Sequence, residues 1–185
     1  MILALLITAY LSGSIPTALV VSMRVKGVDI RRIGNGNMGA QNVFHEIGPK
    51  YGVLVAAIDI LKGALPVFLA HALGLSLTWQ ITAGILAILG HDFPLFADFK
   101  GGQGTACSGG TMLVLFPLIT LAGLITIGIM FLFIRHFNKS TAIGCAFVAL
   151  MLGISHQWLL LIYAVVVFLF IPVRLFFDAP RRMDI

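Results

Sequence analysis

Long apolar runs separated by short polar stretches dominate this chain. The runs cover residues 1–23, 51–73, 75–89, 105–134 and 141–173. A kink is expected in the first run at Pro16, which cannot donate a backbone hydrogen bond and follows a serine- and glycine-containing stretch. A transmembrane helix needs about 17–25 mostly apolar residues, so the pattern predicts an all-α integral membrane protein.

The two longest apolar runs decide the predicted topology. If residues 105–134 and 141–173 are one helix each, five helices cross the membrane and basic loops lie on both sides. If each run turns back, at residues 116–117 and 155–157, seven helices place nearly all Lys and Arg on one side. The positive-inside bias favours a seven-helix bundle with the N-terminus outside and the C-terminus in the cytoplasm. The half-runs are shorter than a usual span, so this interpretation requires short, tilted helices or locally thinned lipid.

Composition agrees with a membrane location. Of the 185 residues, 59% are hydrophobic and 10% are charged, and the mean hydropathy is +1.05. The net charge of +5 comes from sparse Lys and Arg between apolar runs, a distribution that orients loops toward the cytoplasm and does not indicate nucleic-acid binding. Without a domain boundary or repeat, residues 1–185 are expected to form one membrane domain, whose oligomeric state is not predicted.

Two polar, glycine-rich loops are the candidate binding sites, and in the seven-helix topology both face the cytoplasm. Glycines let backbone N–H groups converge on an anion, and a following helix N-terminus adds positive potential, so the loops predict a phosphate pocket. The alternative is a pair of solvated turns. The predicted substrate-binding residues are Gly34, Gly36, Asn37, Gly39, Asn42, His91, Lys100, Gly101, Gly102 and Gly104.

Asp59 and Lys62 stand three residues apart within the second predicted span. This spacing favours pairing on one helix face, either as a structural ion pair or as part of a site. The following Gly63 indicates close packing against another helix. No HExxH, GxSxG or close carboxylate pair is present, so the sequence predicts no metal or cofactor and assigns no catalytic residue.

Several short motifs in a fixed order give the chain a family resemblance. They are Gly-Ser-Ile-Pro at 13–16, Gly-Asn-Met-Gly-Ala at 36–40, Asp-Ile-Leu-Lys-Gly at 59–63, and Phe-Lys-Gly-Gly at 99–102 followed by Gly104. In these motifs the chain resembles the bacterial acyl-phosphate:glycerol-3-phosphate acyltransferases (PlsY), small seven-helix enzymes of the inner membrane. The resemblance runs from residue 13 to residue 109, and the last third matches only in hydropathy.

The resemblance implies an enzyme of phospholipid biosynthesis. It would transfer an acyl group from acyl-phosphate to glycerol-3-phosphate, giving lysophosphatidic acid and phosphate. Acyl-phosphate is already activated, so the protein mainly has to position two phosphates and neutralise their charge. The implied partners are acyl-phosphate, glycerol-3-phosphate and membrane lipid, with no cofactor, and the implied location is the bacterial inner membrane.

Five positions depart from the family pattern. They are Asn35, His45, Gln103, Leu175 and Asp178, which replace serine, arginine, lysine, histidine and asparagine. Since a charge-assisted hydrogen bond contributes about 1.5–3 kcal/mol, these changes leave an alternative function open: a catalytically impaired relative that binds a phospholipid or phosphate metabolite. Cations that would substitute for the lost groups are Lys100, Arg31, Arg32, Arg174 and a protonated His45. A small transporter is a further hypothesis, although no inverted repeat supports it.

Overall fold

The computed structural model describes the backbone of residues 1–178 and the side chains of these residues except 137, 138 and 172–178, and the regular secondary structure of this part consists of helices. The α-helices are α1 (Ile2–Gly13), α2 (Thr17–Lys26), α3 (Ala40–Glu46), α4 (Pro49–Ala72), α5 (Leu77–Asp92), α6 (Thr105–Leu115), α7 (Pro117–Ile134), α8 (Phe137–Ile154) and α9 (Trp158–Asp178). Two 3₁₀ turns, η1 (Ile30–Arg32) and η2 (Leu95–Ala97), lie in the connecting loops. The C-terminus, predicted to be cytoplasmic, lies outside the described residues.

The predicted kink in the first apolar run is a complete helix break. α1 ends at Gly13 and α2 begins after Pro16, because Pro16 has no N–H to continue the helix and disfavours helical geometry at Ile15. A carbonyl freed at such a break needs a partner inside an apolar bundle. The Nζ of Lys62 on α4 supplies it, donating to the Ile15 carbonyl oxygen at 2.9 Å.

Both long C-terminal runs turn back where the seven-helix interpretation requires. Phe116 is extended, with φ −148° and ψ 69°, and Pro117 is the first residue of α7. At the second break, His156 adopts a left-handed φ of 55° and its N–H donates to the Gly153 carbonyl, which ends α8. The five-helix alternative, with unbroken helices through these runs, is therefore wrong for residues 105–171.

The four resulting helices differ in length. α7 and α8 have 18 residues each and α9 has 21, whereas α6 has 11. The expectation that the half-runs fall below the span length is confirmed for three of them, whose described apolar parts, Thr105–Leu115, Lys139–Ile154 and Trp158–Ile171, have 10–17 residues, and is wrong for α7, which has 18. Across the described residues, four segments are long and apolar enough to cross a membrane: Ile2–Lys26, Pro49–Ala72, Leu77–Ala97 and Pro117–Ile134.

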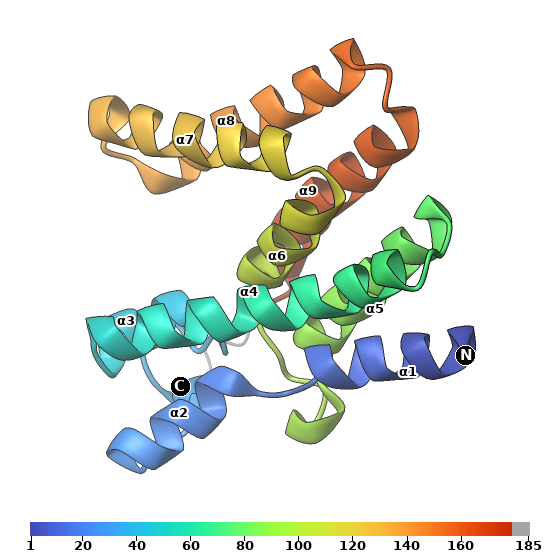
Figure 1. Ribbon diagram of the computed structural model, residues 1–185. Coiled ribbons are helices and arrows are strands. Elements are labelled where there is room, and N and C mark those ends of the chain that lie inside the picture. The colour runs from blue at the N-terminus through green and yellow to red at the C-terminus, as the bar shows by residue number, and fades with distance from the viewer. Residues whose placement is uncertain (179–185) are drawn as a thin grey trace.

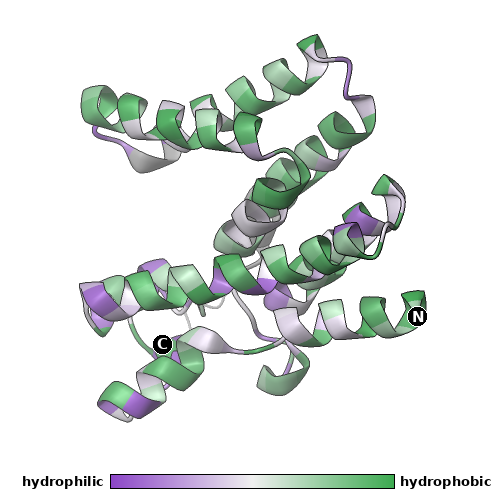
Figure 2. Ribbon diagram, in the orientation of Figure 1, coloured by the Kyte–Doolittle hydropathy of each residue, from purple (hydrophilic) through white to green (hydrophobic). Residues whose placement is uncertain are grey.

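Helix α4 lies at the centre of the fold and contacts α1, α3, α5 and α6, while α7 and α8 form an antiparallel pair to one side (Figure 1). The crossing of α4 and α6 is close because Gly63 faces the Cys107 carbonyl and Gly110 faces the Ile60 carbonyl, with no room for a Cβ. This confirms the close packing predicted at Gly63. α7 is apolar along most of its length, and its outward side chains such as Leu118 and Phe133 are exposed, as in a helix that contacts lipid (Figure 2).

Several connections between helices lie at two opposite ends of the molecule. The N-terminus, the turn between α4 and α5 and the turn between α8 and α9 lie at one end, and α3 and the turn between α7 and α8 lie at the other (Figure 1). The polar stretch from 24 to 50 is more ordered than a plain loop, because it contains η1 and α3. Buried Ile30, Val43 and Ile47 pack there with Val55 of α4 and hold this segment against the bundle.

Candidate functional site

The side chain of Asn42 holds the 34–42 loop together by hydrogen bonds. It is buried on α3, with 2% of its surface exposed. Its amide nitrogen donates to the carbonyl oxygens of Ile30, Ile33 and Asn37, each at 3.0 Å, and its Oδ1 accepts from the Asn35 N–H at 3.2 Å. The side chain is thus used within the protein, where it holds together the turns that precede α3.

The rest of this loop is shaped by glycine and asparagine. Gly34 has a left-handed φ of 60°, and a Cβ there would collide with the Asn42 side chain. Asn35 is exposed, and its Oδ1 accepts from the Asn37 N–H at 3.0 Å, a typical asparagine turn. Gly36 is also left-handed, and Gly39 immediately precedes α3. The predicted loop residues are therefore brought into one compact turn.

The 100–104 loop is pinned to the end of α5. The N–H groups of Gly101 and Gly102 donate to the carbonyls of Asp92 and His91, both at 3.2 Å. Gly104, with φ 69°, leads into α6, and the buried Asp92 carboxylate lies beside it, where a negative charge stabilises the helix N-terminus. Lys100 is exposed at the start of the loop.

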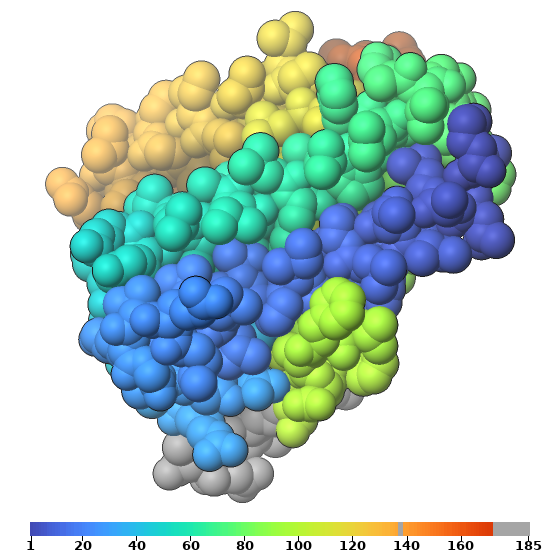
Figure 3. All heavy atoms as spheres, turned by 60° about the horizontal axis from the view of Figure 1, so that its bottom comes forward, coloured from blue at the N-terminus to red at the C-terminus, as the bar shows by residue number. Residues whose placement is uncertain are grey.

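The two loops meet, as predicted. A Cβ built on Gly102 would lie 3.0 Å from the carbonyl oxygen of Met38, in the middle of the other loop, and would collide with Nε2 of His91. In the space-filling view the segment around residues 95–100 adjoins the N-terminal 40 residues (Figure 3). Two stretches more than 60 residues apart in sequence, Met38 and Gly102, therefore share one surface.

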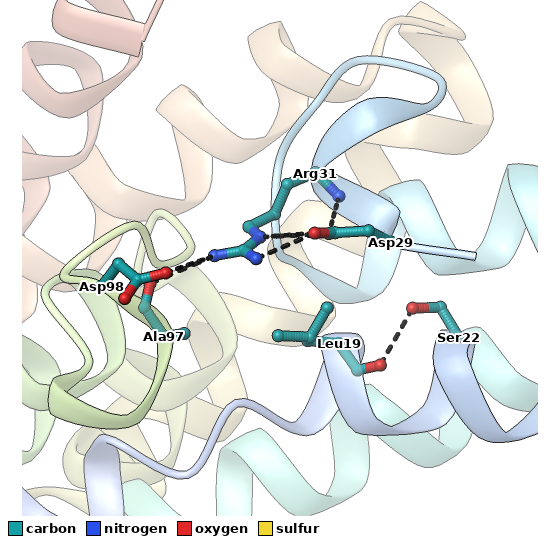
Figure 4. Close-up of polar contacts among 6 residues, drawn as sticks. All are labelled: Leu19, Ser22, Asp29, Arg31, Ala97 and Asp98. Carbon is teal, nitrogen blue, oxygen red and sulfur yellow. Dashed lines mark hydrogen bonds and ion pairs between the residues drawn. The ribbon is translucent and has the colours of Figure 1, made fainter. Parts of the chain in front are cut away.

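A second link joins the same two regions through Arg31 of η1 (Figure 4). Its Nη1 donates to the Ala97 carbonyl oxygen at 3.2 Å and lies 3.8 Å from the Asp98 carboxylate. Its other nitrogens bind the Asp29 carboxylate at 2.8–3.2 Å, and this hydrogen bonding lowers the pKa of Asp29 and raises the pKa of Arg31. Arg31 is therefore committed to holding loops together and is not the free cation expected from sequence.

The other proposed substitute cations differ in position. Lys100, Arg32 and His45 are exposed, whereas the side chain of Arg174 lies outside the described residues. Among the substituted positions, Asn35 is exposed and Gln103 is half-buried. The side chains of Leu175 and Asp178 are also outside the described part of the chain.

The predicted Asp59–Lys62 pair is confirmed, with 2.9 Å between Lys62 Nζ and Asp59 Oδ1. Sequence reasoning missed its link to His91, whose Nδ1 lies 3.8 Å from the same carboxylate oxygen. All three side chains are at least 93% buried. The sequence does show a histidine near the end of one span and a charged pair within another. Only the packing of α4 against α5 shows that these side chains are neighbours.

A largely apolar cavity of about 120 Å³, partly open to the outside, lies between α6, α7, α8 and α9. Its lining includes Thr105, Ser108, Met112, Cys145, Val148 and Phe168. The cavity begins beside the first turn of α6, directly after the 100–104 loop. A polar surface at the loops and an apolar cavity beyond them suit an amphipathic ligand with an anionic head and a hydrocarbon tail.

Comparison with known proteins extends the resemblance to the last third of the chain. A sequence profile described as glycerol-3-phosphate acyltransferase matches residues 3–178. The chain is 44% identical over 148 residues to glycerol-3-phosphate acyltransferase 1 of Deinococcus radiodurans, which covers 80% of this chain and 73% of that protein. It is 38% identical over 175 residues to the glycerol-3-phosphate acyltransferase of Bacillus subtilis, covering 94% of this chain and 90% of that protein.

Solved structures show the same fold. The crystal structure of PlsY, an integral membrane glycerol 3-phosphate acyltransferase, in its glycerol 3-phosphate form matches with a TM-score of 0.86 at 34% identity, covering 99% of this chain and 92% of that one. The lysophosphatidic acid form matches with a TM-score of 0.84 at 33% identity, with the same coverage. The earlier expectation that the last third matches only in hydropathy is therefore wrong.

Proposed function

This chain belongs to the glycerol-3-phosphate acyltransferase family, and from this premise we infer that it acylates glycerol-3-phosphate in phospholipid synthesis. The inference is supported by identities of 37–48% to curated glycerol-3-phosphate acyltransferases and by the full-length match to PlsY. The alternative, a catalytically impaired relative, rests only on the substituted loop positions and is not favoured by these similarities. The observation in the molecule that carries the proposal is the meeting of the two glycine loops beside an apolar cavity.

We place acyl-phosphate as the donor. The glycerol hydroxyl oxygen attacks the acyl carbonyl carbon, the bond between that carbon and the phosphate oxygen breaks, and inorganic phosphate leaves. The hydroxyl proton passes to a phosphate oxygen, so the reaction needs no protein nucleophile. The protein contributes by bringing the two substrates together and by neutralising charge.

The phosphate groups are placed at the shared surface of the two loops. Lys100 is exposed there, and the 34–42 loop adds the Asn37 side chain, whereas the N–H groups of Asn35, Gly36 and Asn37 are used within the loop. The N-terminus of α6 is already faced by the Asp92 carboxylate, so the phosphates are placed on the side of Lys100 and Asn37. Asn42, Gly101 and Gly102 act by shaping the loops, since their donors are used within the protein, and His91 acts by packing against Gly102.

The acyl tail is placed in the cavity between α6 and α9. Its lining is apolar, it begins next to the loop that holds the phosphate, and it is partly open to the surrounding lipid. A donor lying across this junction has its activated carbonyl close to the glycerol-3-phosphate site.

The proposed topology has seven membrane-crossing segments, with α1 and α2 counted as one. It places the N-terminus outside and both glycine loops on the cytoplasmic side of a bacterial inner membrane. Its support is the position of the helix ends: the polar 24–50 segment and the turn between α7 and α8, which carries Arg135, lie at the same end of the molecule (Figure 1). Basic residues at one end agree with the positive-inside bias.

The experiment that tests this function is a reaction with purified protein in detergent. Acyl-phosphate and glycerol-3-phosphate are supplied, and lysophosphatidic acid and released phosphate are measured together. Equal amounts of both products, dependent on the protein and on glycerol-3-phosphate, are expected. Absence of both would contradict the acyltransferase function, whereas lysophosphatidic acid formed only from an acyl thioester would contradict the choice of donor.

The tail site makes a prediction about chain length. Cys145 lines the cavity from α8, and replacing it with phenylalanine fills part of the space. We expect Cys145→Phe to lower kcat/KM for long-chain acyl-phosphates by roughly tenfold, equivalent to about 1.4 kcal/mol of lost apolar contact, and to leave short-chain donors unaffected. Initial rates with a series of acyl-phosphates measure this. The neighbouring Ala146→Phe, on the exposed face of α8, is the control, and an equal loss for all chain lengths would place the tail elsewhere.

A further inference from the structure

A chain of buried polar contacts runs through the bundle to the glycine loops. It starts at the break between α1 and α2, where the Ile15 carbonyl accepts from Lys62 Nζ at 2.9 Å. Lys62 Nζ also lies 2.9 Å from Asp59 Oδ1, and the same oxygen is 3.8 Å from His91 Nδ1. The exposed fractions of Asp59, Lys62 and His91 are 2%, 7% and 5%.

The far side of His91 faces the loops. A Cβ at Gly102 would collide with His91 Nε2, so the imidazole lies directly against the Gly102 backbone, and the Met38 carbonyl oxygen of the other loop lies 3.0 Å from the same Cβ position. The Gly102 N–H donates to the His91 carbonyl, which fixes the loop and the histidine to each other. A change in the direction of the imidazole is therefore transmitted to Gly102 and, through it, to the 34–42 loop.

Charges are rarely placed inside an apolar bundle without a role or a partner, because their desolvation is costly. Here the three groups come from two helices and brace a third segment, the helix break at Ile15, against the end of α5. The Thr111–Tyr163 hydrogen bond between α6 and α9 is equally buried but does not reach either loop. The Asp59–Lys62–His91 chain therefore differs from the Thr111–Tyr163 pair in its contact with the glycine loops and not in its burial.

We propose that Asp59, Lys62 and His91 are positioning residues for acyl transfer, which set the spacing of the two glycine loops through the contact of His91 with Gly102. This inference rests on the proposed function, because the loops are taken as the glycerol-3-phosphate site. The tail cavity is bounded by other helices, so the positioning residues act on the acceptor and not on the acyl chain.

The test compares Asp59→Asn and His91→Gln with Tyr163→Phe as the matched control. Loss of loop spacing is expected to raise the KM for glycerol-3-phosphate by roughly tenfold or more in the first two variants, with the KM for acyl-phosphate unchanged, because small misplacements of bound groups have large effects. Tyr163→Phe is expected to lower the melting temperature and to leave both KM values unchanged. If all three variants lose only thermal stability, the three residues are structural and the proposal is wrong.

Hydrogen exchange supplies a readout that does not depend on activity. In Asp59→Asn, backbone amides of peptides covering 34–42 and 99–106 are expected to exchange faster, while those of α7 and α8 keep the wild-type rate. Where Asp59→Asn fails to fold, the charge-neutral double variant Asp59→Asn/Lys62→Met replaces it. If the exchange rates of the two loops are unchanged in Asp59→Asn, the positioning role is wrong. Absence of turnover in the wild type would instead contradict the proposed function, and hydrogen exchange would still test the positioning role.

Discussion

Replacing Gly102 with alanine is expected to reduce acyltransferase turnover about a hundredfold, with the protein still folded. The added methyl group would collide with the buried His91 ring and press on the Met38 carbonyl, neither of which is the free end of a flexible side chain. The two loops must then separate, and a displacement of about 1 Å between bound groups is enough to cost a factor of this size. The measurement is kcat with saturating acyl-phosphate and glycerol-3-phosphate.

Gly128→Ala on α7 is the control for Gly102→Ala. Nothing lies within 4 Å of a Cβ at Gly128, so the same chemical change is introduced without a collision. Its turnover is expected to equal that of the wild type, and its melting temperature to be equal or slightly higher, because alanine is the better helix former. Wild-type turnover in Gly102→Ala would mean that the contact between the loops is not needed for activity.

The second large effect is expected from Asn42→Asp. The carboxylate has nearly the same shape as the amide but cannot donate to the carbonyls of Ile30, Ile33 and Asn37. Each buried carbonyl left without its donor costs about 1–3 kcal/mol, and the carboxylate additionally repels all three. We therefore expect the 34–42 loop to open and turnover to fall at least about a hundredfold, more than in Asn42→Ala, which leaves the carbonyls unpaired but introduces no charge.

Turnover and protease sensitivity of the loop, measured on the same preparations, check this prediction. Gln80→Glu makes the same exchange of an amide for a carboxylate at the start of α5, where Gln80 caps the Leu75 carbonyl at 2.8 Å, far from the loops. It is expected to lower stability modestly and to leave turnover unchanged. If both Asn42→Asp and Asn42→Ala keep wild-type turnover, the activity does not depend on the amide, whereas equal losses in the two variants would show that the added charge has no effect of its own.

Local signals in the sequence explain which parts of the fold were predictable. The breaks near Pro16 and Pro117 and at residues 155–157 follow from proline geometry and from a polar stretch in an apolar run, so they were expected where they occur. α3 was not predicted, because seven residues in a polar stretch show no clear helical period. It exists because Val43 and Ile47 pack against Ile30 and Val55, residues that are distant along the chain.

The candidate site was likewise predictable from the sequence only in part. That two glycine loops would lie together was predicted, but Asn42, Gly101 and Gly102 were expected to donate to substrate, and in the fold their donors are used by neighbouring carbonyls. Arg31 was expected to be a free cation and instead pairs with Asp29. A polar group is used within the protein when a carbonyl or carboxylate lies near it. These neighbours come from segments distant in sequence, so the sequence alone does not reveal them.

Residue pattern was sufficient to establish a helical membrane protein, its helix breaks, its charged pair in α4 and its family, because each of these depends on composition, local backbone chemistry or short motifs. Tertiary packing alone decided that His91 touches both Asp59 and the Gly102 loop, that Asn42 is internal, and that an apolar cavity begins directly after the 100–104 loop. These features arise where helices cross, and the positions of crossings depend on side-chain packing between segments that the chain itself keeps far apart.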